Sequence, residues 1–132
     1  MKTSEVFPFR RYLHDPQNPE SLSHSSIYSI YEDKSGTLWI GTNQGLNRFD
    51  PDRETFTRYL IDPQNPGDIS RNRIMAIGED EHGMLWLGTR GGGLNIFNPR
   101  NGRIARYTHE AQNPKSLSMN DILILEYQRH CL

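Results

Sequence analysis

The sequence predicts an all-β fold in which short antiparallel strands form sheets of four, and two observations support this prediction. First, the chain repeats itself: Trp39 and Trp86 are 47 residues apart, as are Tyr12 and Tyr59. Second, each period contains four short apolar runs separated by Gly, Pro, Asn and Asp, and no run keeps the 3.6-residue period of a helix. Four strands in a period of about 40–50 residues are typical of a β-propeller blade.

The first strand of each repeat is expected at Ile27–Asp33 and Ile74–Asp80. A turn follows in which Asp is the first residue and Gly the fourth, at Gly36 and Gly83. An Asp side chain accepts hydrogen bonds from the backbone ahead of it, and Gly tolerates the positive φ at the exit. These residues therefore predict a type I turn.

The second strand is expected at Leu38–Thr42 and Leu85–Thr89, where aliphatic, aromatic and β-branched residues indicate burial. Trp39 and Trp86 recur with the repeat, as core residues must, whereas a ligand site needs to occur only once. We therefore expect both tryptophans to fill the space between successive sheets.

The third and fourth strands complete the blade. In these strands the apolar residues are expected on one face and the polar residues on the other, with a bulge allowed in Leu46–Phe49. The third strand is expected at Leu46–Asp50 and Leu94–Asn98, and the fourth at Thr55–Ile61 and Arg103–Thr108.

These repeats divide the chain into four parts. Residues 1–26 are expected to hold the last strand of a preceding blade and an inter-blade loop, residues 27–73 the first blade and residues 74–121 the second. Residues 122–132 are expected to hold the first strand of a third, truncated blade. Ten strands amount to about two and a half blades of a seven-bladed ring, which needs about 28 strands. We expect a fragment of a longer propeller. A ring closed by three copies is the alternative, although it would lack two middle strands of one blade.

Composition excludes several classes of function. The 15 Lys and Arg residues balance 16 Asp and Glu residues, so no charged field points to nucleic acid. No run approaches the roughly 18 apolar residues of a membrane span, and the N-terminus has no apolar signal segment. Cys131 is the one cysteine of the sequence, which excludes an internal disulfide. We expect no metal site and no cofactor.

The repeated unit resembles the two-component regulator propeller repeat. It reads Ile-x-x-Ile-x-Glu-Asp-x-x-Gly-x-Leu-Trp-Ile-Gly-Thr-x-x-Gly-Leu-Asn-Arg-Phe at Ile27–Phe49 and returns, with one inserted glycine, at Ile74–Phe97. The Asn-Pro-x-Ser-Leu-Ser segments at Asn18–Ser23 and Asn113–Ser118 are similar to that family's inter-blade loop. The resemblance implies a periplasmic sensor propeller, in many members for polysaccharide breakdown products. Its signal would pass to a histidine kinase or a diguanylate cyclase, which is encoded outside this sequence.

Polar residues that differ between the repeats are expected at one rim of the blades. In a propeller, the inter-blade loops and the turns between second and third strands share this rim, which is the default binding surface. Amide and guanidinium groups suit hydroxyl-rich ligands such as oligosaccharides, although they also serve to cap loops and face water. The candidate ligand-binding residues are Asn43, Gln44, Arg71, Asn72, Arg73, Arg90 and Asn120.

No catalytic residue is expected. The histidines have no repeated partner, and His109 and Glu110, a conceivable acid–base pair, lie where the other repeats begin a turn. The leading hypothesis is therefore a non-catalytic sensory or ligand-binding propeller. Two alternatives stay open: a propeller-type lyase with a rim histidine as base, and an assembly module. The expected partners are an oligosaccharide ligand and further propeller blades, in the same chain or in other copies.

Overall fold

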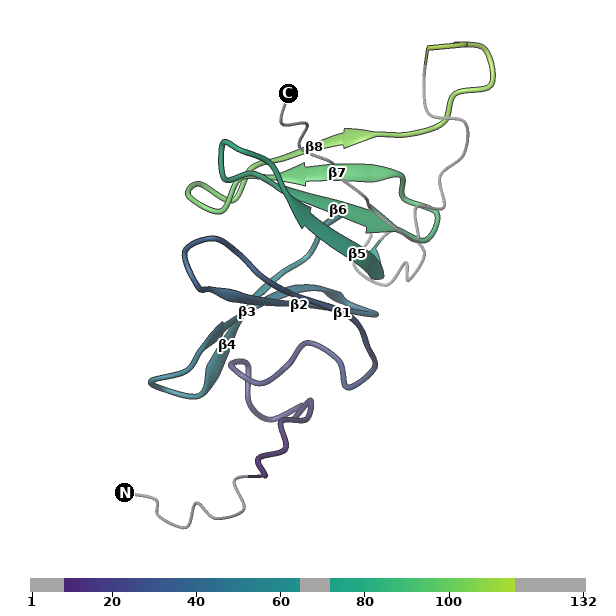
Figure 1. Cartoon of the computed structure of the whole chain (residues 1–132). Helices are drawn as coiled ribbons and strands as arrows, with labels where there is room; N and C mark the ends of the chain where they lie inside the picture. The colour runs from purple at the N-terminus through teal and green to yellow at the C-terminus, as the bar shows by residue number, and fades with distance from the viewer. Residues whose placement is uncertain (1–8, 65–71, 116–132) are drawn as a thin grey trace.

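The computed structural model describes residues 9–64 and 72–115, which form two four-stranded antiparallel sheets (Figure 1). Within each sheet the strands lie side by side in sequence order. The all-β fold and the four-stranded blades predicted from the sequence are confirmed. The strands are β1 (Ile27–Glu32), β2 (Leu38–Thr42), β3 (Gly45–Asp50) and β4 (Thr55–Tyr59), then β5 (Ile74–Glu79), β6 (Leu85–Thr89), β7 (Leu94–Phe97) and β8 (Ile104–Tyr107).

The turn between the first two strands has the predicted chemistry. The Asp33 carboxylate accepts hydrogen bonds from the backbone amides two and four residues ahead, both at 2.9 Å, and Gly36 has a φ of 89°. The other carboxylate oxygen of Asp33 accepts the Trp39 Nε1–H at 2.8 Å. In the second blade, Asp80 accepts the Trp86 indole in the same way at 3.1 Å. The recurring Asp therefore ties the turn to the following strand.

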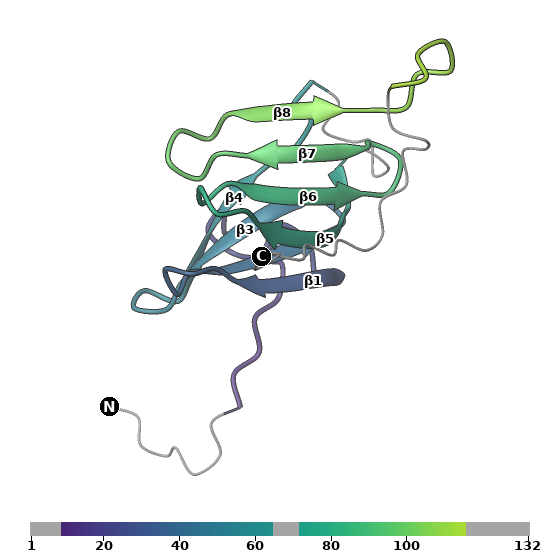
Figure 2. The same cartoon turned by 45° about the horizontal axis from the view of Figure 1, so that its top comes forward.

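The two sheets pack face to face, with their first strands, β1 and β5, in contact (Figures 1 and 2). Phe97 of the second sheet lies 5.8 Å from the Trp39 ring and 5.0 Å from the Tyr59 ring, measured between centroids. Trp39 is 1% exposed. Trp39 therefore fills the space between successive sheets, as predicted.

Gly41 permits this close packing. A Cβ atom at Gly41 would lie 2.6 Å from the Cβ of Ile74, which is shorter than van der Waals contact. Ser29 Oγ also donates to the Ile74 carbonyl at 3.0 Å. The repeated Leu-Trp-x-Gly-Thr segment therefore combines a large side chain that fills the space between the sheets with a glycine that lets the next sheet approach closely.

Both faces of the first sheet carry apolar residues, which corrects one expectation from the sequence. The register of β3 against its neighbours is regular, so Leu46 and Phe49 point to opposite faces. Leu46 belongs to the core between the sheets, and Phe49 packs on the other face with Ile40 and Phe56. A bulge that brings the apolar residues onto one face is not formed, because the second sheet covers one face and Tyr12 and Leu22 pack on the other.

Residues 9–26 form no strand, so the strand expected before Ile27 is absent from the described residues. A strand requires a partner strand, and the described part of the chain supplies none on that side. The Tyr12 side chain nevertheless lies 5.3 Å from the Phe49 ring, much as Tyr59 lies 5.0 Å from Phe97. The strand expected from Ile122 lies outside the described residues.

Trp86 departs from the prediction that both tryptophans are buried between sheets. It is 36% exposed, and its neighbour across the sheet face, Tyr107, is 52% exposed. Within residues 9–64 and 72–115, no third sheet packs on this face. A further blade packed on this face would bury Trp86, as the second blade buries Trp39.

Candidate functional site

Three side chains meet at the rim where the first blade ends and the second begins. Arg73, immediately before β5, donates from Nε to the Asn43 side-chain oxygen at 2.6 Å. Its guanidinium carbon lies 4.9 Å from the centroid of the Tyr28 ring. Asn43 comes from the turn between β2 and β3, and Tyr28 from β1. The structure thus brings together two of the predicted rim residues, Asn43 and Arg73, with one that was not predicted.

This group is not part of the repeated framework. In the second blade, Met75 stands at the position of Tyr28 and Arg90 at the position of Asn43. The blade therefore folds without these side chains. Tyr28 is 40% exposed, so an aromatic surface beside a cation is accessible to solvent. A contact that the fold does not require is a candidate for binding.

The Arg73 guanidinium retains hydrogen-bonding capacity. Arginine has five N–H donors. Within the described residues, Arg73 Nε donates to Asn43, and the terminal nitrogens of the guanidinium make no further hydrogen bond there. Its stacking on Tyr28 and its bond to Asn43 hold the fork in one orientation. A guanidinium held in this way can donate to hydroxyl or carboxylate oxygens at a lower entropic cost than a free side chain.

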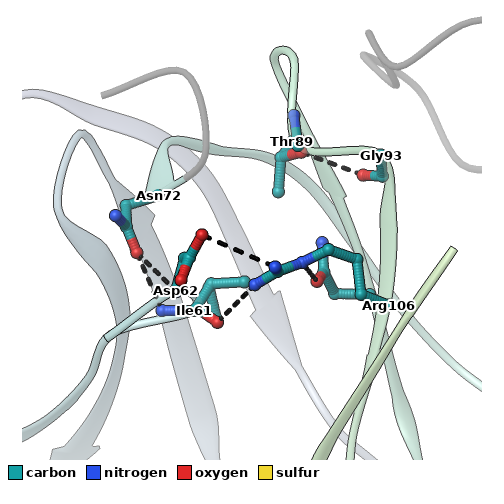
Figure 3. A network of polar contacts seen from close by, with 8 residues as sticks. Ile61, Asp62, Asn72, Thr89, Gly93 and Arg106 are labelled. Atoms are coloured by element: carbon teal, nitrogen blue, oxygen red, sulfur yellow. Dashed lines mark hydrogen bonds and ion pairs between the residues drawn. The ribbon is translucent and has the colours of Figure 1, made fainter. Parts of the chain in front are cut away.

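Asn72 has a structural role at the junction of the blades. Its side chain is fully buried, and its oxygen accepts the backbone N–H groups of Ile61 at 3.0 Å and Asp62 at 2.8 Å (Figure 3). Arg106 of β8 reaches the same segment, donating to the Ile61 carbonyl at 3.0 Å and lying 3.5 Å from the Asp62 carboxylate. Figure 3 also shows Thr89 donating to the Gly93 carbonyl across a turn. The expected ligand contact through Asn72 is therefore not available at the surface.

The other predicted rim residues fall into two groups. Gln44 is exposed and lines a hollow of about 390 Å³ together with Ser23, Arg58, Leu60 and Pro63. Arg90 is exposed on the corresponding turn of the second blade. Arg71 and Asn120 lie outside the described residues.

Sequence reasoning missed two kinds of polar residue. Asn47 is fully buried, accepts the Ser23 N–H at 2.9 Å and donates to the Ser23 hydroxyl at 2.9 Å. Its recurrence as Asn95 was the signal for a structural role. Tyr28 was missed as a site residue because it lies in a strand. An aromatic residue at a position that the second repeat fills with Met75 could have drawn attention to it.

At the opposite end of the blades, Glu79 joins the two sheets. Its carboxylate accepts the Lys34 backbone N–H at 2.9 Å and the Tyr31 hydroxyl at 3.3 Å. Burial, and next the charge of Glu79, raise the pKa of Tyr31 above its usual value. Tyr31 therefore remains a neutral donor, which suits a structural link.

Two of the described histidines, His14 and His24, are engaged with the backbone near the loop that precedes β1. His14 Nδ1 lies 2.8 Å from the Leu22 carbonyl, and His24 Nδ1 accepts the Ser26 N–H at 3.0 Å. Among the residues that the structure describes, no three His, Cys, Asp or Glu side chains gather as metal ligands. No helix in that part of the chain is long and apolar enough to cross a membrane.

The paired sheets, their shared tryptophan-and-phenylalanine core and their polar rim define a set of β-propeller blades. The family model described as two component regulator propeller matches residues 21–44 and again residues 68–91. The extracellular domain of the hybrid two-component system BT3049 from B. thetaiotaomicron is similar in structure, with a TM-score of 0.63 and 32% sequence identity over 76% of this chain. Two segments of the chain therefore match the repeat of the two-component regulator propeller family, and the resemblance noted in the sequence is confirmed.

A curated relative shows the same relationship over a shorter stretch. Histidine kinase P4 of Formosa agariphila is 55% identical over 31 residues, which are 24% of this chain. The chain spans 2% of the length of that kinase and 14% of the solved BT3049 domain. These blades are therefore related to the extracellular domain of a two-component system.

Proposed function

We propose that these blades belong to a non-catalytic signal-input propeller, and that Arg73, Tyr28 and Asn43 contact a hydroxyl-rich ligand such as an oligosaccharide. The observation that carries this proposal is the exposed pairing of Arg73 with Tyr28 at 4.9 Å, in a place where the second blade has no equivalent pair. Aromatic faces stack on the apolar side of a sugar ring, and guanidinium and amide groups bond its hydroxyls. The group combines both kinds of contact.

The relatives, rather than the site, support a proposal for the location and the output. The similar solved domain is extracellular, and the curated relative is a histidine kinase. We propose that this propeller lies in the periplasm and passes its signal, through a phosphorelay, to a histidine kinase output encoded outside this sequence.

The proposal is tested by binding to a glycan array, followed by calorimetry with the best oligosaccharide. The chain with Arg73→Ala should bind at least about tenfold more weakly, and Tyr28→Ala should have a similar effect because the stacked pair acts as a unit. Arg100→Ala is the matched control, since Arg100 is exposed in the β7–β8 turn at the other end of the second blade. Equal losses in all three variants, or none in any, would remove the rim group from the proposal.

A further inference from the structure

The core between the two blades contains a specific seat for one side chain. Phe97 inserts between Trp39 and Tyr59, at 5.8 and 5.0 Å between ring centroids. The corresponding residues of the second blade are Trp86 and Tyr107, which are 36% and 52% exposed. They line an open groove of about 500 Å³ with Leu94 and Ile96 among others. The second blade therefore presents the same seat without a described occupant.

The side chain that fits this seat is also present, on the far side of the first blade. Phe49 occupies in β3 the position that Phe97 occupies in β7. It packs with Ile40 and Phe56 on the face that points away from the second blade. One chain thus carries the two halves of a single interface on opposite faces. Such halves join copies head to tail.

Tyr12 covers Phe49 in the single chain. Its ring meets Phe49 edge to face at 5.3 Å and Phe56 at 5.6 Å. Tyr12, Tyr59 and Tyr107 are successive members of one repeat series. Tyr12 therefore occupies the place that Tyr107 of a second copy would take beside Phe49. The two tyrosines compete for one position.

Glu54 holds Tyr12 there. Its carboxylate accepts the Tyr12 hydroxyl at 3.1 Å and pairs with Arg10 at 2.6 Å. Glu54 has a φ of 56°, a left-handed conformation, and the second blade has Gly102 at the equivalent turn position with a φ of 76°. In both turns the backbone N–H at this position donates to the carbonyl four residues earlier at 2.7 Å. A left-handed turn position favours glycine. We therefore explain the glutamate here by the bonds of its side chain to Tyr12 and Arg10.

We propose that this chain binds a second copy head to tail. Phe49 of one copy enters the groove between Trp86 and Tyr107 of the other, and Tyr12, held by Glu54, is the latch that opposes this binding. The interface repeats the one already formed between the two blades of a single chain. Association therefore requires that Tyr12 leaves Phe49 and that Tyr107 of the other copy takes its place.

The test is the concentration dependence of solution mass, measured by light scattering on the full chain with circular dichroism on the same samples. Tyr12→Ala should raise the association constant at least about tenfold over that of the unmodified chain, because the face around Phe49 is uncovered. Adding Trp86→Asp to Tyr12→Ala should return the mass to that of the unmodified chain. Arg100→Ala, at an exposed residue of the β7–β8 turn, should leave the mass unchanged.

Glu54→Gly is a milder second variant, since it gives the first turn the residue that the second turn already has. It should release Tyr12 without removing any apolar contact, and so increase association in the same direction by a smaller factor. If Tyr12→Ala loses the β-sheet signal in circular dichroism, the Glu54→Gly variant tests the proposal in its place. Variants that stay folded and keep the mass of the unmodified chain at every concentration would overturn the proposal. So would an increase that Trp86→Asp does not reverse.

Discussion

Trp39 and Asp33 are joined by a hydrogen bond of 2.8 Å from the indole N–H to the carboxylate. The same carboxylate caps the turn between β1 and β2, so one side chain fixes both the turn and the ring that fills the core. Partial burial alone would raise the pKa of Asp33, but the hydrogen bonds from Trp39 and from the turn outweigh it and lower the pKa below 3.8. Asp80 shows the same balance with Trp86.

This lowered pKa predicts an acid-sensitive contribution to stability. A carboxylate with a depressed pKa in the folded state stabilises the fold above its unfolded pKa, and the contribution is lost as the pH falls through the folded value. Asp33→Asn should therefore reduce the fall in melting temperature below about pH 4, measured by circular dichroism. Asp52→Asn, in the exposed β3–β4 turn, is the control. An unchanged acid profile for Asp33→Asn would contradict this account.

Phe97 should be the most sensitive residue of the core between the blades, because it contacts the rings of Trp39 and Tyr59 and is fully buried. Phe97→Ala is expected to lower the free energy of unfolding by about 3–5 kcal/mol, measured by urea denaturation. Phe9→Ala, at a side chain that is 93% exposed, should change it by less than about 0.5 kcal/mol. Similar effects at both positions would mean that the blades do not pack as described.

Two glycines with similar backbone angles should differ in their tolerance of alanine. Gly36 and Gly45 have φ values of 89° and 96°, so alanine is strained at both, by about 1–2 kcal/mol. A Cβ at Gly36 meets nothing within 4 Å, whereas a Cβ at Gly45 meets the backbone carbonyl of Tyr59. Gly45→Ala should therefore cost clearly more than Gly36→Ala in thermal unfolding. Equal costs would show that the backbone angle alone sets the effect.

Asn72 should matter for stability rather than for binding. Asn72→Ala leaves the buried N–H groups of Ile61 and Asp62 without their described acceptor, at a cost of about 1–3 kcal/mol for each group that stays unsatisfied. Gln44→Ala, at an exposed residue of the same rim, should be nearly neutral. The two are compared by denaturant unfolding. A stable Asn72→Ala chain with weakened ligand binding would reverse this assignment.

The repeat explains why most of the fold could be predicted. Features that serve the blade must recur, so Trp39, Gly36 and the strand boundaries could be located from their second copies. Features that depend on neighbours could not be: Trp39 and Trp86 lie in the same Leu-Trp-x-Gly-Thr motif, yet the structure buries one and leaves the other 36% exposed. The rim site was found in part. Arg73 and Asn43 were selected as polar and variable, whereas the burial of Asn72 depends on backbone groups 10 or 11 residues away in the chain.

Arg106 ties the outer strand of the second blade to the end of the first. Apolar contact is non-directional and would let two sheets rotate against one another, but the fork of Arg106 reaches from β8 to the Ile61 carbonyl at the point where the chain leaves the first blade. That bond constrains the rotation between neighbouring sheets. In a circular array a small angular error at each junction accumulates, and the array opens into a spiral. Together with the Ser29 and Glu79 bonds at the inner strands, this polar contact at the outer strand helps to set whether successive blades can meet end to end.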